Sequence, residues 1–309
     1  MGEALARYGF GEGHPWTRDR LWAFWEEACL RGLDAFVDIE EPPAATEEDL
    51  LLFHERDHVA FVKKKSGEGM GFLDEGDTPA FSGIFEAATQ VVGSAITGAR
   101  FLMTHKGHFV FCPIGGLHHA RRAASGGFCV FNDIGVAAGI LRRDYGLKRI
   151  LYVDIDAHHG DGVYYGFEED PDFFIADVHE DGKYLYPGTG SPNEKGKGQA
   201  YGTKLNLALP PGAKDDAFLN AWDAAKSFME GIYPDFVILV CGTDGLAGDP
   251  LSHLKYSPAV FEEVGHWLAA YARRRASGRL MALGGGGYSL RNLATGWSTV
   301  LTALAEESA

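Results

Sequence analysis

The sequence predicts an α/β protein built around a buried, mainly parallel β-sheet. From His108 onward, short apolar runs alternate with segments of helical periodicity, which is the pattern of strands joined by crossover helices. Runs such as Phe236–Val240 are apolar throughout, as expected for strands covered by helices on both faces. Several of these runs end in polar clusters, and ligands of open parallel sheets gather at such carboxyl ends.

The first hundred residues predict helices and loops. Thr46 and the three acids that follow it open a helix, because the hydroxyl caps the helix and the acids favour its positive end. The Gly- and Lys-rich stretches Lys63–Gly71 and Pro187–Gly202 are predicted to be loops. Neither has the sustained polar composition of an interdomain tether, so we expect a single domain over residues 1–309.

The rest of the chain supplies the predicted sheet and its covering helices. The strand candidates are HFVFCP, RILYVDIDAHH, FFIADVH, DFVILVCGTD and RLMALGGGGY. The helix candidates are VFNDIGVAAGILRRDYG, Ala217–Gly231, Pro258–Arg275 and Arg291–Glu306.

Composition narrows the classes of partner. The 28 basic and 43 acidic residues give a formal charge of −15, which argues against a phosphate-backbone ligand, so no nucleic-acid partner is expected. The four cysteines are scattered, which favours a reducing compartment over a disulfide framework. No run of 18 apolar residues and no leader pattern is present, so we expect no membrane segment and a cytoplasmic location.

The segment from Asp154 to Asp161 is the strongest candidate for a metal site. Residues two apart in an extended segment point the same way, so Asp154, Asp156 and His158 share one side as the strand ends. Carboxylates and imidazoles suit zinc or a similar divalent ion, and a catalytic site needs three protein ligands. Asp244, which follows a separate strand, is the natural third ligand.

The alternative for this segment is a loop whose acids cap a helix at Gly162. It is disfavoured because five ionisable groups among eight residues after an apolar strand would be costly to bury without a function.

A second histidine pair, His118 and His119, lies between glycine-rich turns that let the backbone pass close to a ligand. Such a pair alone is more often structural. Here Asp154 and Asp161 are carboxylates that could orient the two imidazoles, which favours a catalytic interpretation.

The glycine run ending in Tyr288 lacks the lysine and hydroxyl residue of a phosphate-binding loop. A tyrosine on such a loop could instead donate its hydroxyl to an oxyanion.

Four motifs together resemble the zinc-dependent histone deacetylase family, including its bacterial acetoin-utilisation members. They are GGLHHARRAASGGFCVFND, YVDIDAHHGDGV, CGTDGLAGDPLS and GGGGYSLRN. The resemblance implies an arginase/deacetylase-like three-layer fold with a mainly parallel, eight-stranded sheet flanked by helices.

The resemblance also implies roles for single residues. One Zn²⁺ per chain would be held by Asp156, His158 and Asp244. His119 backed by Asp161 resembles the general base, His118 backed by Asp154 its electrostatic companion, and Tyr288 the residue that polarises the acyl carbonyl. Residues that resemble the substrate-binding positions are Asp77, Gly127, Phe128, Tyr186 and Leu251.

The sequence also departs from the family. Tyr186 stands where many relatives have phenylalanine, and Asp177 where a serine often helps to bind potassium. The segment Gln199–Lys204 does not align cleanly with the neighbouring potassium region. The resemblance therefore allows a K⁺ ion without requiring one.

The expected reaction is hydrolysis of an N-acyl amide, with an acyl-lysine protein or peptide as the favoured substrate. Acetylated polyamines are the alternative, although Leu251 is not the acidic gatekeeper of some polyamine-selective relatives. Less favoured are a dimanganese ureohydrolase, which expects a further D-x-D pair where this chain has Thr243–Leu246, and a non-catalytic acyl-lysine-binding protein.

Overall fold

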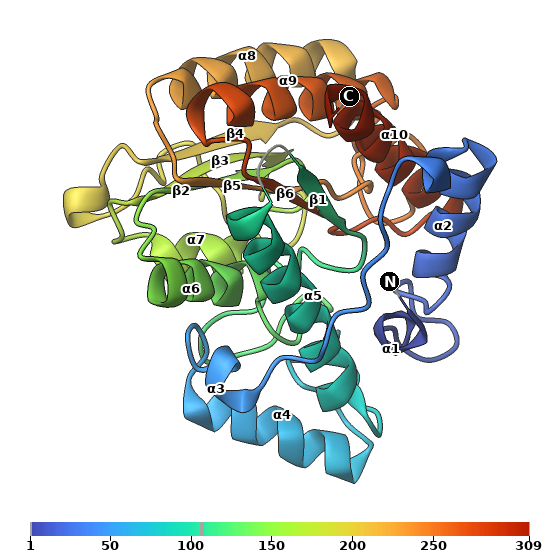
Figure 1. Cartoon of the computed structure of the whole chain (residues 1–309). Coiled ribbons are helices and arrows are strands. Elements are labelled where there is room, and N and C mark those ends of the chain that lie inside the picture. Colours follow the sequence, from blue (N-terminus) through green and yellow to red (C-terminus); the bar gives the residue numbers. More distant parts are fainter. Residues whose placement is uncertain (1, 106–107, 309) are drawn as a thin grey trace.

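The computed structural model describes residues 2–105 and 108–308, so Met1, residues 106–107 and Ala309 lie outside the described part of the predicted domain. Its centre is one all-parallel sheet with the strand order β1-β6-β5-β2-β3-β4 (Figure 1). The strands are β1 (Phe109–Cys112), β2 (Ile150–Asp154), β3 (Phe173–Glu180), β4 (Lys204–Leu209), β5 (Phe236–Val240) and β6 (Leu280–Leu283).

Helices cover both faces of the sheet. Figure 1 shows α8 (Asp215–Glu230), α9 (Ala259–Arg275) and α10 (Leu290–Ser308) on one face. It shows α5 (Ile84–Thr104), α6 (Asp133–Tyr145) and α7 (Asp161–Phe167) on the other. The remaining elements are α1 (Glu3–Ala6), α2 (Arg20–Leu30), α3 (Glu47–Leu50), α4 (Arg56–Glu68) and the short 3₁₀ turns η1 (Leu33–Ala35) and η2 (Gly198–Ala200).

The predicted fold class is confirmed, because a parallel sheet lies between two helical layers. Strands β2, β5 and β6 are fully buried, as their uninterrupted apolar sequences predict. The sheet has six strands in the described residues, two fewer than the family resemblance implies. Further pairing is limited to isolated bridges, such as Leu246 with Tyr256, which do not extend into strands.

One local expectation was wrong, and one strand was not predicted. Lys63–Gly71 was expected to be a loop, but α4 runs through Glu68 and ends only at Gly69, which adopts the left-handed conformation that glycine tolerates. Its buried face, including Val59 and Val62, outweighs the unfavourable Lys- and Gly-rich composition. Strand β4 was not anticipated at all, because it begins with the charged Lys204. The predicted cap at Thr46 is present as a complete capping box with Asp49.

The strand order places a switch point between β2 and β5. From β2 the chain passes outward to β3 and β4, and it then returns to the opposite side of β2 as β5. In open parallel sheets the crevice at such a point, beyond the carboxyl ends of the strands, is where ligands bind. Asp154 lies opposite Val240 in the β2/β5 register. The polar residues that follow both strands therefore enter the same crevice.

Among the described residues, no helix combines the length and the apolar character that crossing a membrane would require.

Candidate metal centre and active site

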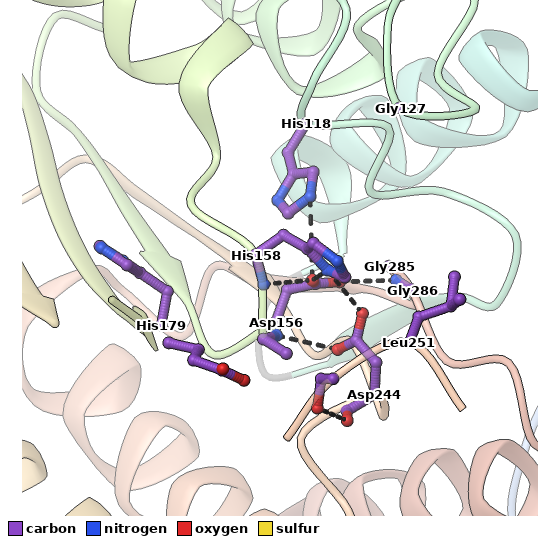
Figure 2. A network of polar contacts seen from close by, with 12 residues as sticks. His118, Gly127, Asp156, His158, His179, Asp244, Leu251, Gly285 and Gly286 are labelled. Carbon is purple, nitrogen blue, oxygen red and sulfur yellow. Dashed lines mark hydrogen bonds and ion pairs between the residues drawn. The ribbon is translucent and has the colours of Figure 1, made fainter. Parts of the chain in front are cut away.

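Three side chains converge at the switch point between β2 and β5. Asp156 and His158 follow β2, and Asp244 follows β5. Their ligand atoms all lie within 4.8 Å of one another, and all three residues are buried. Figure 2 shows the imidazole of His158 directed at both carboxylates, with its Nδ1 3.1 Å from Asp156 Oδ1 and 3.0 Å from Asp244 Oδ2.

Backbone amides hold the outer oxygen of each carboxylate. Asp156 Oδ2 accepts a hydrogen bond of 2.7 Å from Gly286 N, and Asp244 Oδ1 accepts one of 2.8 Å from Ala157 N. Because one oxygen of each carboxylate is fixed in this way, the other is left facing His158. The two strand ends are thus tied to each other and to the loop after β6.

Gly286 is required by this close approach. A Cβ atom at Gly286 would lie 2.8 Å from Asp156 Oδ2 and closer still to Asp244 Oδ2. Any side chain there would force the two carboxylates apart. The glycine run before Tyr288 therefore lets the backbone approach the candidate metal ligands closely. This close approach is the structural reason for the glycine at position 286.

The charge of this group calls for a cation. Burial, followed by the neighbouring Asp156 carboxylate, raises the pKa of Asp244 to about 7. Two carboxylates without solvent are costly unless a positive charge lies between them. Two oxygen donors and one imidazole nitrogen are a donor set that fits Zn²⁺, with a coordination position left for water or substrate. Within the described residues, this is the one group of three or more potential ligands found.

The two histidines lie beside the candidate metal ligands, each backed by a carboxylate. His118 Nδ1 is 2.7 Å from Asp154 Oδ2, and His119 Nδ1 is 2.7 Å from Asp161 Oδ1. The two Nε2 atoms face each other at 3.1 Å. All four side chains are buried. These are the pairings that the sequence suggested.

The two imidazoles titrate in opposite directions. Burial alone lowers the pKa of an imidazole, but the carboxylates of Asp154 and Asp156 more than offset it at His118 and raise its pKa to about 10. At His119, burial and the adjacent His118 charge lower the pKa to about 4, although Asp161 opposes this change. At neutral pH this arrangement holds a cationic His118 beside a neutral His119, which can act as a base.

Asp161 belongs to the first turn of α7, so the helix of the alternative interpretation does form. The residue does not cap it: the N-cap is Gly160, with no side-chain hydrogen bond. The Asp161 carboxylate instead binds His119 through Oδ1, while Oδ2 accepts hydrogen bonds from Arg121 Nε and Nη2 at 3.0 and 2.7 Å. Arg121 thus fixes the carboxylate that orients His119.

Tyr288 is half-buried next to these groups. Its ring centroid is 6.4 Å from that of His158 and 5.7 Å from that of Phe128. Burial, together with the charges of Asp244 and Asp156, raises its pKa well above the ordinary value. The hydroxyl therefore keeps its proton and remains a hydrogen-bond donor.

Arg20 and Asp249 hold the loop that carries Tyr288, and sequence reasoning assigned neither a role. The buried Arg20 guanidinium donates to Gly285 O at 2.6 Å and also to Gly287 O. Asp249 Oδ2 accepts a hydrogen bond of 2.7 Å from Tyr288 N. An arginine six residues after His14, directly before the apolar run Leu21–Trp25, was the available sequence signal for Arg20. Asp249 had none beyond its place in the motif CGTDGLAGDPLS.

Three of the expected substrate-binding residues, Gly127, Phe128 and Tyr186, lie close to His119 or Tyr288. Gly127 has a φ of 53°, and a Cβ there would lie 2.5 Å from His119 Cδ2, so only glycine fits. Phe128 is half-buried next to Tyr288, and the Tyr186 ring lies 4.9 Å from that of His119. Tyr186 and Leu251 are 44% and 37% exposed, so both side chains reach the protein surface.

Asp77 is exposed on a loop that is tied to Phe128. Asp74 Oδ1 accepts hydrogen bonds from the amides of Gly76, Asp77 and Thr78. The hydroxyl of Thr78 in turn accepts one of 3.0 Å from Phe128 N. The loop that presents Asp77 is therefore fixed before any substrate arrives, and it is bonded to the backbone of Phe128.

Comparison with known proteins agrees with this geometry. The model of the histone deacetylase domain matches residues 14–304. The acetoin utilization protein AcuC of Bacillus subtilis (strain 168) is 37% identical over 305 residues, which are 95% of this chain and 78% of the relative. The protein of the same name from Staphylococcus aureus (strain MRSA252) is 32% identical over 99% of this chain and 80% of its own. The crystal structure of the HDA15 HD domain superimposes with a TM-score of 0.89 at 28% identity, covering 99% of this chain and 87% of that one.

Proposed function

The chain belongs to the histone deacetylase family and is an amide-hydrolysing deacetylase, and from this premise we propose that it removes acyl groups from the side-chain amine of lysine in proteins or peptides. The ureohydrolase and the non-catalytic alternatives are set aside by the family. The observation that carries the proposed chemistry is the placement of two carboxylate-backed histidines beside a buried Asp-His-Asp group.

Asp156, His158 and Asp244 are the residues that would hold a single Zn²⁺ ion. When bound, such an ion supplies Lewis acidity and lowers the pKa of bound water to about 7. The chain's own residues then have three tasks: to take a proton from water, to stabilise the charge that develops on the acyl oxygen, and to return a proton to the leaving amine.

The proton transfers fall to the two histidines. His119 is neutral at physiological pH, because burial and His118 lower its pKa, so it can accept a proton from the attacking water. Asp161 holds its Nδ1 and thereby places the accepting lone pair on Nε2. His118, whose pKa is raised to about 10, is the positive neighbour that stabilises negative charge in the transition state. The amine receives its proton from a histidine that has become protonated.

Tyr288 is the proposed oxyanion donor. Its hydroxyl stays protonated because burial and two nearby carboxylates raise its pKa. Arg20 and Asp249 fix the peptide between Gly287 and Tyr288, so the donor needs little rearrangement to act. Burial of the site strengthens this interaction relative to water.

The preference for acyl-lysine over acetylated polyamines is supported by the rim. Asp77 sits on a pre-formed loop bonded to Phe128, where its carboxylate can accept hydrogen bonds from the backbone amides of a peptide. A polyamine has no such amides next to its acyl group. Leu251, which is 37% exposed, offers no charge for the distal amines of a polyamine.

The test is a kcat/KM panel on the metal-loaded enzyme. Acyl-lysine peptides of increasing acyl length are compared with acetylated putrescine, spermidine and spermine, and we expect the best peptide to exceed the best polyamine at least about tenfold. A polyamine that equals or exceeds every peptide would overturn the lysine assignment and leave the deacetylase chemistry intact.

A further inference from the structure

Lys204 begins the edge strand β4 with a charged side chain that is buried. Only 2% of the residue is exposed. Its Nζ donates to Asp170 O at 2.9 Å, to Phe173 O at 2.5 Å and to Thr203 Oγ1 at 2.8 Å. An ammonium group has three donors, so all of them are used.

The oxygens around this ammonium are neutral. Within the described residues Lys204 forms no ion pair, and the nearby Asp170 carboxylate instead binds Arg142 Nη1 at 2.5 Å. Burial disfavours the charged form and lowers the pKa of Lys204 to about 8. The group still remains largely protonated at neutral pH. A buried cation surrounded only by carbonyl and hydroxyl oxygens is unusual for lysine, whose charge is normally exposed or paired.

The same surroundings suit a free monovalent ion. Rings of backbone carbonyl oxygens replace the hydration shell of K⁺ in proteins, and ammonium and potassium ions are close in size. The turn from Asp170 to Phe173 supplies two such oxygens at the start of β3, and Thr203, immediately before β4, supplies a third. The oxygen cage joins the turn before β3 to the residue before β4.

We propose that Lys204 is a built-in monovalent cation: its ammonium fills an oxygen cage that would otherwise take a potassium-sized ion. This gives a physical meaning to the departure of Gln199–Lys204 from the potassium region of the family. It also means that the β3/β4 edge is held together without any ion from solution.

The proposal differs from an ordinary structural lysine in one respect. If only the hydrogen bonds of the ammonium stabilise the protein, the stability lost on its removal is not regained in any salt. If the cage is a cation site, a variant that vacates the cage regains stability when K⁺ enters, whereas a variant that still fills it does not. Lys204→Ala vacates the cage, and Lys204→Met fills it with an uncharged chain of similar length.

Thermal unfolding of the purified full chain tests this difference. Wild type, Lys204→Ala and Lys204→Met are each measured in KCl and in choline chloride at the same ionic strength of about 0.15 M. In choline chloride we expect both variants to unfold at least about 4 °C below wild type. In KCl we expect Lys204→Ala to recover at least half of its loss and Lys204→Met to recover none.

Any potassium bound elsewhere, for example near Asp177, would affect all three proteins equally. The quantity compared is therefore the rise in unfolding temperature from choline chloride to KCl, taken for each variant minus that of wild type. Lys183→Ala, whose side chain is 80% exposed, is the matched control and should behave as wild type. Crystals of Lys204→Ala soaked in a thallium(I) salt should show an anomalous peak among the three cage oxygens, and wild-type crystals should show none there.

Equal rises in wild type and Lys204→Ala, or rescue of Lys204→Met by K⁺, would overturn the proposal. A Lys204→Ala chain that folds only when K⁺ is present supports it, and one that folds in neither salt contradicts it. None of these measurements needs deacetylase activity. Their outcome is therefore independent of the proposed substrate.

Discussion

The Nε2 atoms of His118 and His119 lie 3.1 Å apart, while each Nδ1 lies 2.7 Å from a carboxylate oxygen. Each carboxylate requires a proton on the Nδ1 that it contacts. The short distance between the two Nε2 atoms then requires one further proton, because two lone pairs would repel each other. His118 has the higher pKa and carries that proton, so its Nε2 donates to the lone pair of His119. The His118–Asp154 pair thus carries the positive charge, and the His119–Asp161 pair provides the base.

This division predicts the pH dependence of kcat/KM. Activity should fall on the acid side as His119 becomes protonated, and because its pKa is lowered to about 4, this limb should lie below the ordinary histidine value of about 6.5. On the alkaline side, activity should fall as His118 loses its proton, with a pKa raised to about 10. Because the two histidines interact, the apparent pKa of each limb belongs to the pair and not to one residue. The quantity to compare is the shift of each limb between variants.

Asp154→Asn and Asp161→Asn separate the two limbs. Loss of the Asp154 charge should move the alkaline limb down by about one unit or more, because that charge raises the pKa of His118. Loss of the Asp161 charge should move the acid limb further down and cut kcat about 10–100-fold, because the base is weaker and less well oriented. Identical profiles for both variants would contradict the assignment of separate roles.

The two groups proposed to act directly on the reaction should be indispensable. His119→Ala removes the base, and Tyr288→Phe removes the oxyanion donor while keeping the ring, so we expect each to lower kcat at least about 100-fold. Metal content, measured by elemental analysis, should stay at the wild-type level. The exposed Tyr233→Phe and the surface variant His266→Ala serve as controls. Near-normal turnover of either active-site variant would remove that residue from the mechanism.

Substitution of a metal ligand should lower the metal content, unlike substitution of His119 or Tyr288. Asp244→Ala removes one of three ligands and leaves Ala157 N without its acceptor, so we expect both metal content and activity to be lost together. Wild type should bind one equivalent of Zn²⁺ per chain and lose it to a chelator, with activity restored by metal. Two equivalents bound with similar affinity would contradict the assignment of a single metal ion per chain.

The sequence predicted the residues of the candidate centre better than the residues that support them. The family resemblance implied the pairing of His118 with Asp154 and of His119 with Asp161, whereas the residue types alone indicated only that the two carboxylates could orient the two imidazoles. Asp244 was accessible from the strand pattern, since the carboxyl ends of parallel strands share one edge.

Arg20 and Lys204 were missed because their partners are backbone oxygens. A carbonyl group belongs to every residue, so nothing in the sequence marks Gly285, Asp170 or Phe173 as acceptors. The α4 helix was missed for a related reason: its stability comes from packing and not from its composition. Tertiary context therefore accounts for both kinds of failure.

Asp77 provides a test of how the enzyme holds a peptide. Because its carboxylate is proposed to accept backbone hydrogen bonds, Asp77→Asn should raise KM for acyl-lysine peptides and lower kcat/KM at least about tenfold. Acetylated polyamines, which lack those amides, should be nearly unaffected. Glu75→Gln removes the same charge from an exposed position on the same loop and is the matched control. An equal loss for peptides and polyamines would show that Asp77 acts only through its charge.

Arg20 should act on turnover through the loop that carries Tyr288. Arg20→Met leaves the buried carbonyls of Gly285 and Gly287 without donors, and each unsatisfied group costs about 1–3 kcal/mol. The loop can recover those bonds only by moving toward water, which displaces Tyr288 from the acyl oxygen. We therefore expect a lower unfolding temperature and a loss in kcat of at least about tenfold, with little change in KM. Arg20→Lys, which keeps a buried donor, should restore part of both. Reduced stability with an unchanged kcat would mean that Arg20 supports the fold alone, because a loop that still presents Tyr288 correctly does not depend on its guanidinium.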